Sequence, residues 1–184
     1  MKQLLDRTRD SLALQESVQV LVFADSHGHS EFMVQVGRRF PGADLILHLG
    51  DHCASLADLS LQLKKPVWGV AGNCDGHFAR HLPAQQLLIL AGKRIFLAHG
   101  HQFGVKHQLN TLLAAGSNPP YLADVILFGH THRYLEQSIQ VNDRQVYLLN
   151  PGSARPGFLE TPASAVLMNL SRLGISCELL LDQT

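Results

Sequence analysis

Two histidines separated by one residue, His130 and His132, follow an apolar run that ends at Gly129. On an extended backbone, side chains two residues apart point to the same side of the strand. We therefore expect both imidazoles to face one side of the chain. The pair alone is consistent both with polar residues at a strand end and with metal ligands.

Four earlier apolar runs also end in polar side chains with oxygen or nitrogen donors. The donors in chain order are Asp25, His27, Asp51, Asn73, His99, His130 and His132. Carboxylate, imidazole and amide groups suit divalent metals such as Mn, Fe, Ni, Zn or Mg. Seven donors exceed what one ion needs, whereas two ions about 3.5–4 Å apart that share a carboxylate would use them all. The pattern predicts a two-metal site.

Each motif has an ordinary structural interpretation as well. DSH or GD after a strand is typical of a turn or a helix cap, and GNCD of a tight turn with a capping Asp. The joint occurrence of all of them at strand ends favours the metal site. Gly50, Gly72 and Gly129 precede three of the donors, and glycine permits the close backbone approach that a crowded site requires.

The donors follow five short apolar runs that are typical of buried strands, at 18–24, 44–50, 66–72, 94–98 and 124–129. Helix-length segments lie between them at 29–39, 53–63 and about 105–115, and Leu56, Leu59 and Leu63 are spaced like one buried helix face. Alternating strands and helices predict an α/β fold, in which ligands bind outside the carboxyl ends of the strands. If these strands share one parallel sheet, all seven donors collect at one edge of it.

The pattern changes to all-β after residue 133. We expect a hairpin that turns at Asn142-Asp143, a loop at NPGSARPG, and two final strands, ASAVLMNL and ISCELLL, around a turn at 172–174. A βαβ half followed by a β half is consistent with two packed sheets with helices outside.

Residues 18–184 are predicted to form one domain. Residues 1–17 form an N-terminal extension, a short helix or an arm, with Leu4, Leu5, Leu12 and Leu14 available for docking.

Composition narrows the function classes. Fifteen basic and fifteen acidic residues give zero formal net charge, which argues against broad nucleic-acid binding but allows a small phosphorylated substrate. The N-terminus lacks the apolar core of a signal peptide, and no run approaches the roughly 18 apolar residues of a membrane span. Three cysteines without a CxxC pair favour the reducing cytoplasm.

The ordered motifs D-x-H, G-D, G-N-x-D, H-G-H, G-H-T-H and N-P-G-S, within about residues 18–181, resemble the calcineurin-like metallophosphoesterases. In particular they resemble the small YfcE-like phosphodiesterase branch, which is related to a retromer scaffold subunit. The resemblance implies the metallophosphoesterase fold, a two-sheet α/β (α+β) sandwich flanked by helices. It also implies that one ion takes Asp25, His27, Asp51 and His132, and the other takes Asp51, Asn73, His99 and His130, with Asp51 bridging.

The same resemblance implies a divalent-metal-dependent phosphoesterase that hydrolyses a small phosphodiester with a hydroxide bridging two metal ions per chain. Manganese is the expected metal, with Ni, Fe, Zn and Mg as alternatives. A non-catalytic protein-binding scaffold, a phosphomonoesterase and a nuclease are the alternative functions. Small members of the family often pair, so a homo-oligomer is also expected.

One position departs from the wider superfamily, whose G-N-H-[DE] motif has the histidine that protonates the leaving group. Cys74 stands there, and we interpret it as a small buried residue. His101, two residues after His99, is the predicted replacement in proton transfer, with His29 and His52 as competitors.

Substrate contacts are predicted at three positions. Asn73 would donate an amide hydrogen to the substrate, while Ser153 and Arg155 in the NPGSAR loop would shape its entrance.

Overall fold

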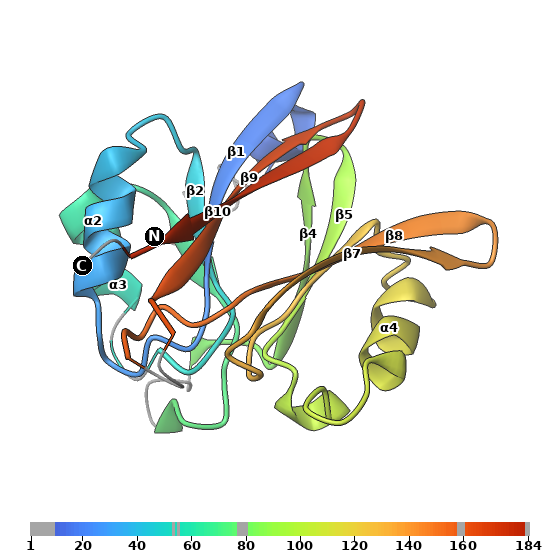
Figure 1. Cartoon of the computed structure of the whole chain (residues 1–184). Helices are drawn as coiled ribbons and strands as arrows, with labels where there is room; N and C mark the ends of the chain where they lie inside the picture. The colour runs from blue at the N-terminus through green and yellow to red at the C-terminus, as the bar shows by residue number, and fades with distance from the viewer. Residues whose placement is uncertain (1–9, 53, 55, 77–80, 158–160, 183–184) are drawn as a thin grey trace.

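Two five-stranded β-sheets pack against each other in the computed structural model, which describes residues 10–52, 54, 56–76, 81–157 and 161–182 (Figure 1). The first sheet has the order β10-β9-β1-β2-β3, with β1 (Ser17–Phe23), β2 (Leu45–His48), β3 (Val67–Gly69), β9 (Ser164–Ser171) and β10 (Ile175–Leu181). The second has the order β4-β5-β6-β8-β7, with β4 (Gln85–Leu90), β5 (Lys93–Ala98), β6 (Val125–Leu127), β7 (Tyr134–Val141) and β8 (Arg144–Pro151).

Each sheet contains three parallel strands whose carboxyl ends lie together. β1, β2 and β3 are parallel in the first sheet, and β5, β6 and β8 in the second, while β4, β7, β9 and β10 pair antiparallel. The loops that leave these six carboxyl ends carry the polar motifs.

The helices cover the outer faces of the sandwich (Figure 1). They are α2 (Glu31–Arg39), α3 (Leu56–Leu63) and α4 (Asn110–Ser117), and a 3-10 helix η2 (His101–Phe103) follows β5. Alternate residues of β1 show the layering: Val20 and Val22 pack between the sheets, while Leu21 and Phe23 pack in the cluster beneath α2 and α3. Both faces of β1 are buried, which explains its nearly continuous apolar sequence.

Most predicted elements are confirmed, with shifts of a few residues. The hairpin turns at Asn142-Asp143, because Val141 pairs with Arg144, and the last two strands form β9 and β10. At the N-terminus, residues 10–14 are helical and Leu12 is buried in the core, whereas Leu14 is exposed. Leu4 and Leu5 lie outside the described residues.

The two packed sheets predicted from the sequence are confirmed, so the condition that all five strands share one parallel sheet is not met. β5 and β6 pair with β8 in a second sheet. Its edge strand β4, antiparallel to β5 at residues 85–90, was not predicted. The carboxyl ends of the parallel strands still meet, but from two sheets.

The helix expected at about 105–115 begins only at Asn110. The residues before it form η2 and a turn, since Gly104 ends η2 in the left-handed conformation with a φ of 64°. Among the described residues, no helix has both the length and the apolar character to cross a membrane.

Candidate metal centre

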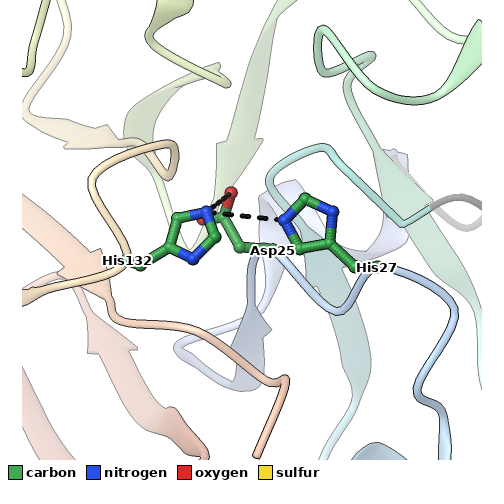
Figure 2. Close-up of side chains that lie close together, drawn as sticks. All are labelled: Asp25, His27 and His132. Atoms are coloured by element: carbon green, nitrogen blue, oxygen red, sulfur yellow. Dashed lines mark hydrogen bonds and ion pairs between the residues drawn. The ribbon is translucent and has the colours of Figure 1, made fainter. Parts of the chain in front are cut away.

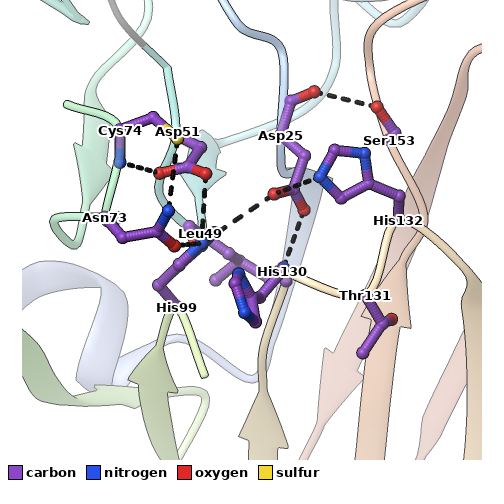
Figure 3. A network of polar contacts seen from close by, with 12 residues as sticks. Asp25, Leu49, Asp51, Asn73, Cys74, His99, His130, Thr131, His132 and Ser153 are labelled. Carbon is purple, nitrogen blue, oxygen red and sulfur yellow. Dashed lines mark hydrogen bonds and ion pairs between the residues drawn. The ribbon is translucent and has the colours of Figure 1, made fainter. Parts of the chain in front are cut away.

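Loops from both sheets converge on a single group of polar side chains (Figure 3). Backbone hydrogen bonds tie the loops together: Asp25 N donates to Gly50 O at 3.0 Å, and Gly129 N donates to His99 O at 3.0 Å. All seven predicted donors lie in these loops, so residues far apart in the sequence share one centre.

Asp25, His27 and His132 form a first group of potential metal ligands (Figure 2). The Nε2 atom of His132 lies 3.2 Å from Asp25 Oδ1 and 3.4 Å from His27 Nε2. One ligand atom from each residue lies within 4.8 Å of the others, which is close enough for one cation to contact all three.

Asp51, His99 and His130 form a second group with the same limit of 4.8 Å. His99 Nε2 lies 3.4 Å from Asp51 Oδ2 and 3.2 Å from Asn73 Oδ1, so Asn73 adjoins this group. Asp51 Oδ2 is also 4.0 Å from His27 Nε2. Asp51 therefore lies between the two groups.

The histidine pair His130 and His132 divides between these groups, and the expectation that both residues lie on an extended backbone is wrong. Both residues follow β6 in a loop and have left-handed φ angles of 67° and 58°. Five of the seven predicted donors share this strained conformation: Asp25, His27, Asp51, His130 and His132. Such residues cost on the order of 1–3 kcal/mol each and cluster at functional sites.

Two of the glycines allow the close approach predicted for them. A Cβ atom at Gly72 would overlap the backbone N and the carboxylate of Asp51. A Cβ atom at Gly129 would lie 2.8 Å from Asp25 Oδ2. Any larger residue at either position would displace a carboxylate of the centre.

The two carboxylates each use one oxygen for the fold. Asp25 Oδ2 accepts a hydrogen bond from His130 N at 2.9 Å, and Asp51 Oδ1 accepts one from Cys74 N at 2.7 Å. The Asp51 loop is held in turn by the buried Asp75, whose Oδ2 accepts from Asp51 N and Gly72 N. The second oxygen of each carboxylate faces the imidazoles.

These donors fit a divalent cation. Asp25 Oδ1 is fully buried and accepts no hydrogen bond, although buried carboxylate oxygens are normally satisfied. His99 Nδ1 lies 2.8 Å from Leu49 O, so that an Nδ1–H donor leaves Nε2 available as a ligand. Neither of these two groups contains a thiolate. Oxygen and imidazole donors of this kind match Mn, Fe, Ni, Zn or Mg.

Burial and neighbouring charges shift the pKa values of the histidines in different directions. Burial, with the charges of His99 and Lys106, lowers the pKa of His130 to about 4, and burial also lowers the pKa of His27 despite Asp51 and Asp25. Burial opposes the charged form of His99, but its hydrogen bond with Asp51 and the charge of Asp25 raise its pKa.

The pKa of Asp51 follows from the same balance. Burial alone would raise it, but hydrogen bonds from His99 and from the backbone of Cys74 hold it well below its usual range. Asp51 is therefore ionised at neutral pH, as a metal ligand must be.

Behind the centre lies a buried cluster that the sequence did not reveal. Ser26 Oγ lies 2.7 Å from His52 Nδ1 and 3.1 Å from His48 Nε2, and all three side chains are buried. The cluster joins the loop that carries Asp25 and His27 to the loop that carries Asp51. Because His52 is buried, it cannot contact a substrate. The one sequence feature that pointed to this cluster was the presence of His48 and His52 on either side of the GD motif.

Cys74 is exposed, so its interpretation as a buried residue is wrong. Its backbone N–H donates to Asp51 Oδ1, and its Sγ lies within 4.8 Å of ligand atoms of His27 and Asp51. His101 lies beside the second group, with its ring 5.3 Å from that of His99 and 6.1 Å from that of His130. His29 is exposed.

The three predicted substrate contacts lie in different surroundings. Asn73 is exposed next to His99, and Arg155 is exposed with its charge acting on His27. Ser153 is buried, and its hydroxyl donates to Asp25 O at 2.8 Å. This hydrogen bond holds Asp25 in place, and the buried hydroxyl of Ser153 is not accessible to a substrate.

A two-sheet sandwich with carboxylates, imidazoles and an amide at the joined strand ends defines the class of metal-dependent phosphoesterases. Residues 18–172 match the family model of the calcineurin-like phosphoesterase superfamily domain. The chain therefore belongs to the calcineurin-like phosphoesterase superfamily, and it is a divalent-metal-dependent phosphoesterase.

Curated relatives agree with this assignment. The chain is 34% identical over 151 residues to the probable metallophosphoesterase YsnB of Bacillus subtilis, covering 80% of this chain and 82% of the relative. It is 31% identical over 129 residues to the phosphodiesterase YfcE of Escherichia coli, covering 66% and 62%.

Solved structures share the fold. A predicted phosphoesterase from Streptococcus pneumoniae aligns with a TM-score of 0.72 at 22% identity, over 91% of both chains. Vacuolar Protein Sorting 29 from Cryptosporidium parvum aligns with a TM-score of 0.66 at 20% identity, over 91% of this chain and 100% of that chain.

Proposed function

We propose that the protein hydrolyses small phosphodiesters with two divalent metal ions per chain, of which manganese is the expected metal and Ni, Fe, Zn and Mg are alternatives. The observation that carries the proposal is the pair of adjacent ligand groups with Asp51 between them. The name of the relative YfcE supports a diester as substrate.

The proposed ligands divide between the two ions. Asp25, His27, Asp51 and His132 would hold one ion, and Asp51, Asn73, His99 and His130 the other. When bound, two such cations acidify a water molecule and neutralise charge on the phosphoryl oxygens.

Side chains at the rim would orient the diester. The exposed Arg155 provides positive charge on the His27 side, and the amide of Asn73 provides a hydrogen-bond donor on the His99 side. His101, whose ring lies near those of His99 and His130, would protonate the departing oxygen. Burial and the charge of His99 lower the pKa of His101, so its acid form is populated mainly at acidic pH.

The cell compartment and the oligomeric state belong to the same proposal. Cys74 and Cys177, the described cysteines, form no disulfide, which supports the cytoplasm as the compartment. A homo-oligomer is proposed from the family resemblance alone.

The test combines metal analysis with hydrolysis of bis-p-nitrophenyl phosphate in Mn²⁺, Ni²⁺ and Zn²⁺. Asp51→Asn should abolish both metal loading and hydrolysis, because Asp51 serves both ligand groups. Asp58→Asn, on the exposed face of α3, should retain both. Hydrolysis retained by Asp51→Asn would contradict the site, and no turnover with any metal would favour a protein-binding scaffold.

A further inference from the structure

A fully buried histidine, His48, ends β2 and has no role in the proposed hydrolysis. β2 runs between β1 and β3, and His48 pairs with Phe23 on one side and with Gly69 on the other. The pairing continues beyond it, because Val70 N donates to His48 O at 3.1 Å. The backbone of His48 is therefore held from both sides within the first sheet.

The ring of His48 carries one hydrogen and one lone pair, since burial and the charges of His52 and His99 lower its pKa well below the ordinary value. Its Nε2 lies 3.1 Å from Ser26 Oγ, whereas its Nδ1 is buried and has no hydrogen-bond partner among the described residues. A buried N–H without an acceptor is rarer in proteins than an unused acceptor. The hydrogen therefore belongs on Nε2, from which His48 donates to the Ser26 hydroxyl.

The Ser26 hydroxyl bonds a second loop as well. Because it accepts from His48, its own hydrogen is left for His52, whose Nδ1 lies 2.7 Å away and whose carbonyl oxygen lies 3.4 Å away. His52 directly follows Asp51 in the sequence. One hydroxyl thus connects the loop after β1 both to β2 and to the loop after β2.

The segment around Ser26 is strained. Asp25 and His27, on either side of it, have left-handed φ angles of 54° and 46°. Residues in this conformation persist only where the surrounding structure holds them. The amides of His27 and Gly28 donate to the backbone of the Asp51 loop at 2.9 and 2.7 Å. The Ser26 hydroxyl adds the side-chain bonds that hold this segment against β2.

The second ligand group is held by other contacts. Asp51 N donates to Asp75 Oδ2 at 3.0 Å, and Cys74 N donates to Asp51 Oδ1 at 2.7 Å. His99 Nδ1 lies 2.8 Å from Leu49 O. None of these bonds involves the buried cluster of two histidines and a serine. A change in that cluster should therefore act on the first ligand group much more than on the second.

We propose that His48 is a positioning residue for the first ligand group. Through the Ser26 hydroxyl it fixes the strained segment 25–28, and with it the orientation of two ligands of the first ion. The second ion does not depend on it. This inference rests on the two-metal centre of the proposed function and adds a residue whose loss separates the two ions.

The test is calorimetric titration with Mn²⁺, in which the two ions of one molecule control for each other. His48→Leu removes the donor at similar volume, so the affinity for one ion should fall by about tenfold or more, the usual effect of a partner that orients metal ligands, while the affinity for the other stays at the wild-type value. His48→Gln, whose amide can donate from a similar position, should restore most of the loss. Ser26→Ala should reproduce the loss, and it carries the test if His48→Leu does not fold.

A variant of His132 identifies the affected ion. In a His132→Asn background, which lacks a ligand of the first group, His48→Leu should not weaken the remaining ion. Ser117→Ala, a buried serine of α4, is the matched control for Ser26→Ala and should leave both affinities unchanged. Equal weakening of both ions, unchanged binding of both, or a His48→Gln variant as weak as His48→Leu would overturn the positioning role.

Uptake of fewer than two Mn²⁺ ions by the wild type would instead contradict the two-metal function. Amide hydrogen exchange of the metal-free protein, followed by NMR, then decides the role of His48 without any metal. In His48→Leu the amides of His27 and Gly28 should exchange faster, while that of Cys74, which bonds Asp51, should keep its wild-type rate. Equal acceleration at all three amides, or at none, would overturn the proposal.

Discussion

Asp25 and Asp51 each divide their two oxygens between the fold and the centre. One oxygen of each accepts a backbone N–H, from His130 or Cys74, and the other faces the imidazoles. Because the backbone bonds fix the carboxylates, the remaining oxygens are oriented before any ligand arrives. This explains why we expect a single Asp→Asn change to remove metal loading rather than weaken it.

His101 carries a prediction about the leaving group. If it acts as the acid, His101→Asn should slow diesters with poor leaving groups by about 10²-fold or more, because they need the proton that p-nitrophenolate does not. The measurement is kcat/KM for alkyl and p-nitrophenyl diesters side by side. His107→Asn, exposed in the same segment, is the control. Equal slowing of both diester types would assign His101 to structure alone.

His130 carries a prediction about pH. Its pKa is about 4 when folded against 6.5 as the ordinary value, so between these values the unfolded chain binds a proton that the folded chain does not. The unfolding free energy of the metal-free protein should therefore fall as pH decreases through this window. Urea unfolding in EDTA should give a shallower fall for His130→Asn, and parallel curves above pH 7. Identical slopes below pH 6.5 would contradict the lowered pKa.

At the scale of elements, the loops after the parallel strands depend on glycine for their close approach. Gly72→Ala should reduce Mn²⁺ binding and destabilise the protein by about 1–3 kcal/mol, because the added Cβ would overlap Asp51. Calorimetric Mn²⁺ titration and urea unfolding measure the two effects.

The control for this change is Gly174→Ala, since a Cβ atom there has no heavy atom within 4 Å. Wild-type Mn²⁺ affinity in Gly72→Ala would show that the loop can move without loss of the centre.

Element prediction succeeded for the buried strands β1 and β2 and for the half-exposed β7 and β10, but it missed the edge strand β4. β1 and β2 are almost wholly buried, and their apolar runs were recognised. β4 contains the apolar run Leu87–Leu90, but it lies at a sheet edge with mixed burial, and the run was not assigned to a strand. The start of α4 was misplaced because the preceding turn depends on the left-handed Gly104.

At the scale of the whole molecule, the centre joins the two sheets. Asp25, His27 and Asp51 follow strands of the first sheet, while His99, His130 and His132 follow strands of the second. Bound metal would therefore link the two halves of the sandwich.

Metal should consequently stabilise the folded protein. With free Mn²⁺ at 100 times the Kd of each site, the unfolding free energy should rise by about 2.7 kcal/mol per bound ion over that in EDTA. Urea unfolding with and without Mn²⁺ measures this difference. Asp51→Asn should show no such gain, and equal unfolding midpoints for the wild type in both conditions would contradict a folded-state metal site.

The sequence by itself determined the donor types, their order at the ends of apolar runs and the family they indicate, because these follow from local composition and spacing. Only the tertiary structure decided that the donors come from two sheets and that His130 and His132 lie in a loop rather than on an extended strand. Strand pairing depends on long-range contacts, and the left-handed conformation of five donors depends on the loops packed around them. For the same reason, the contact of His48 with Ser26 and the burial of Ser153 could not be read from residue types.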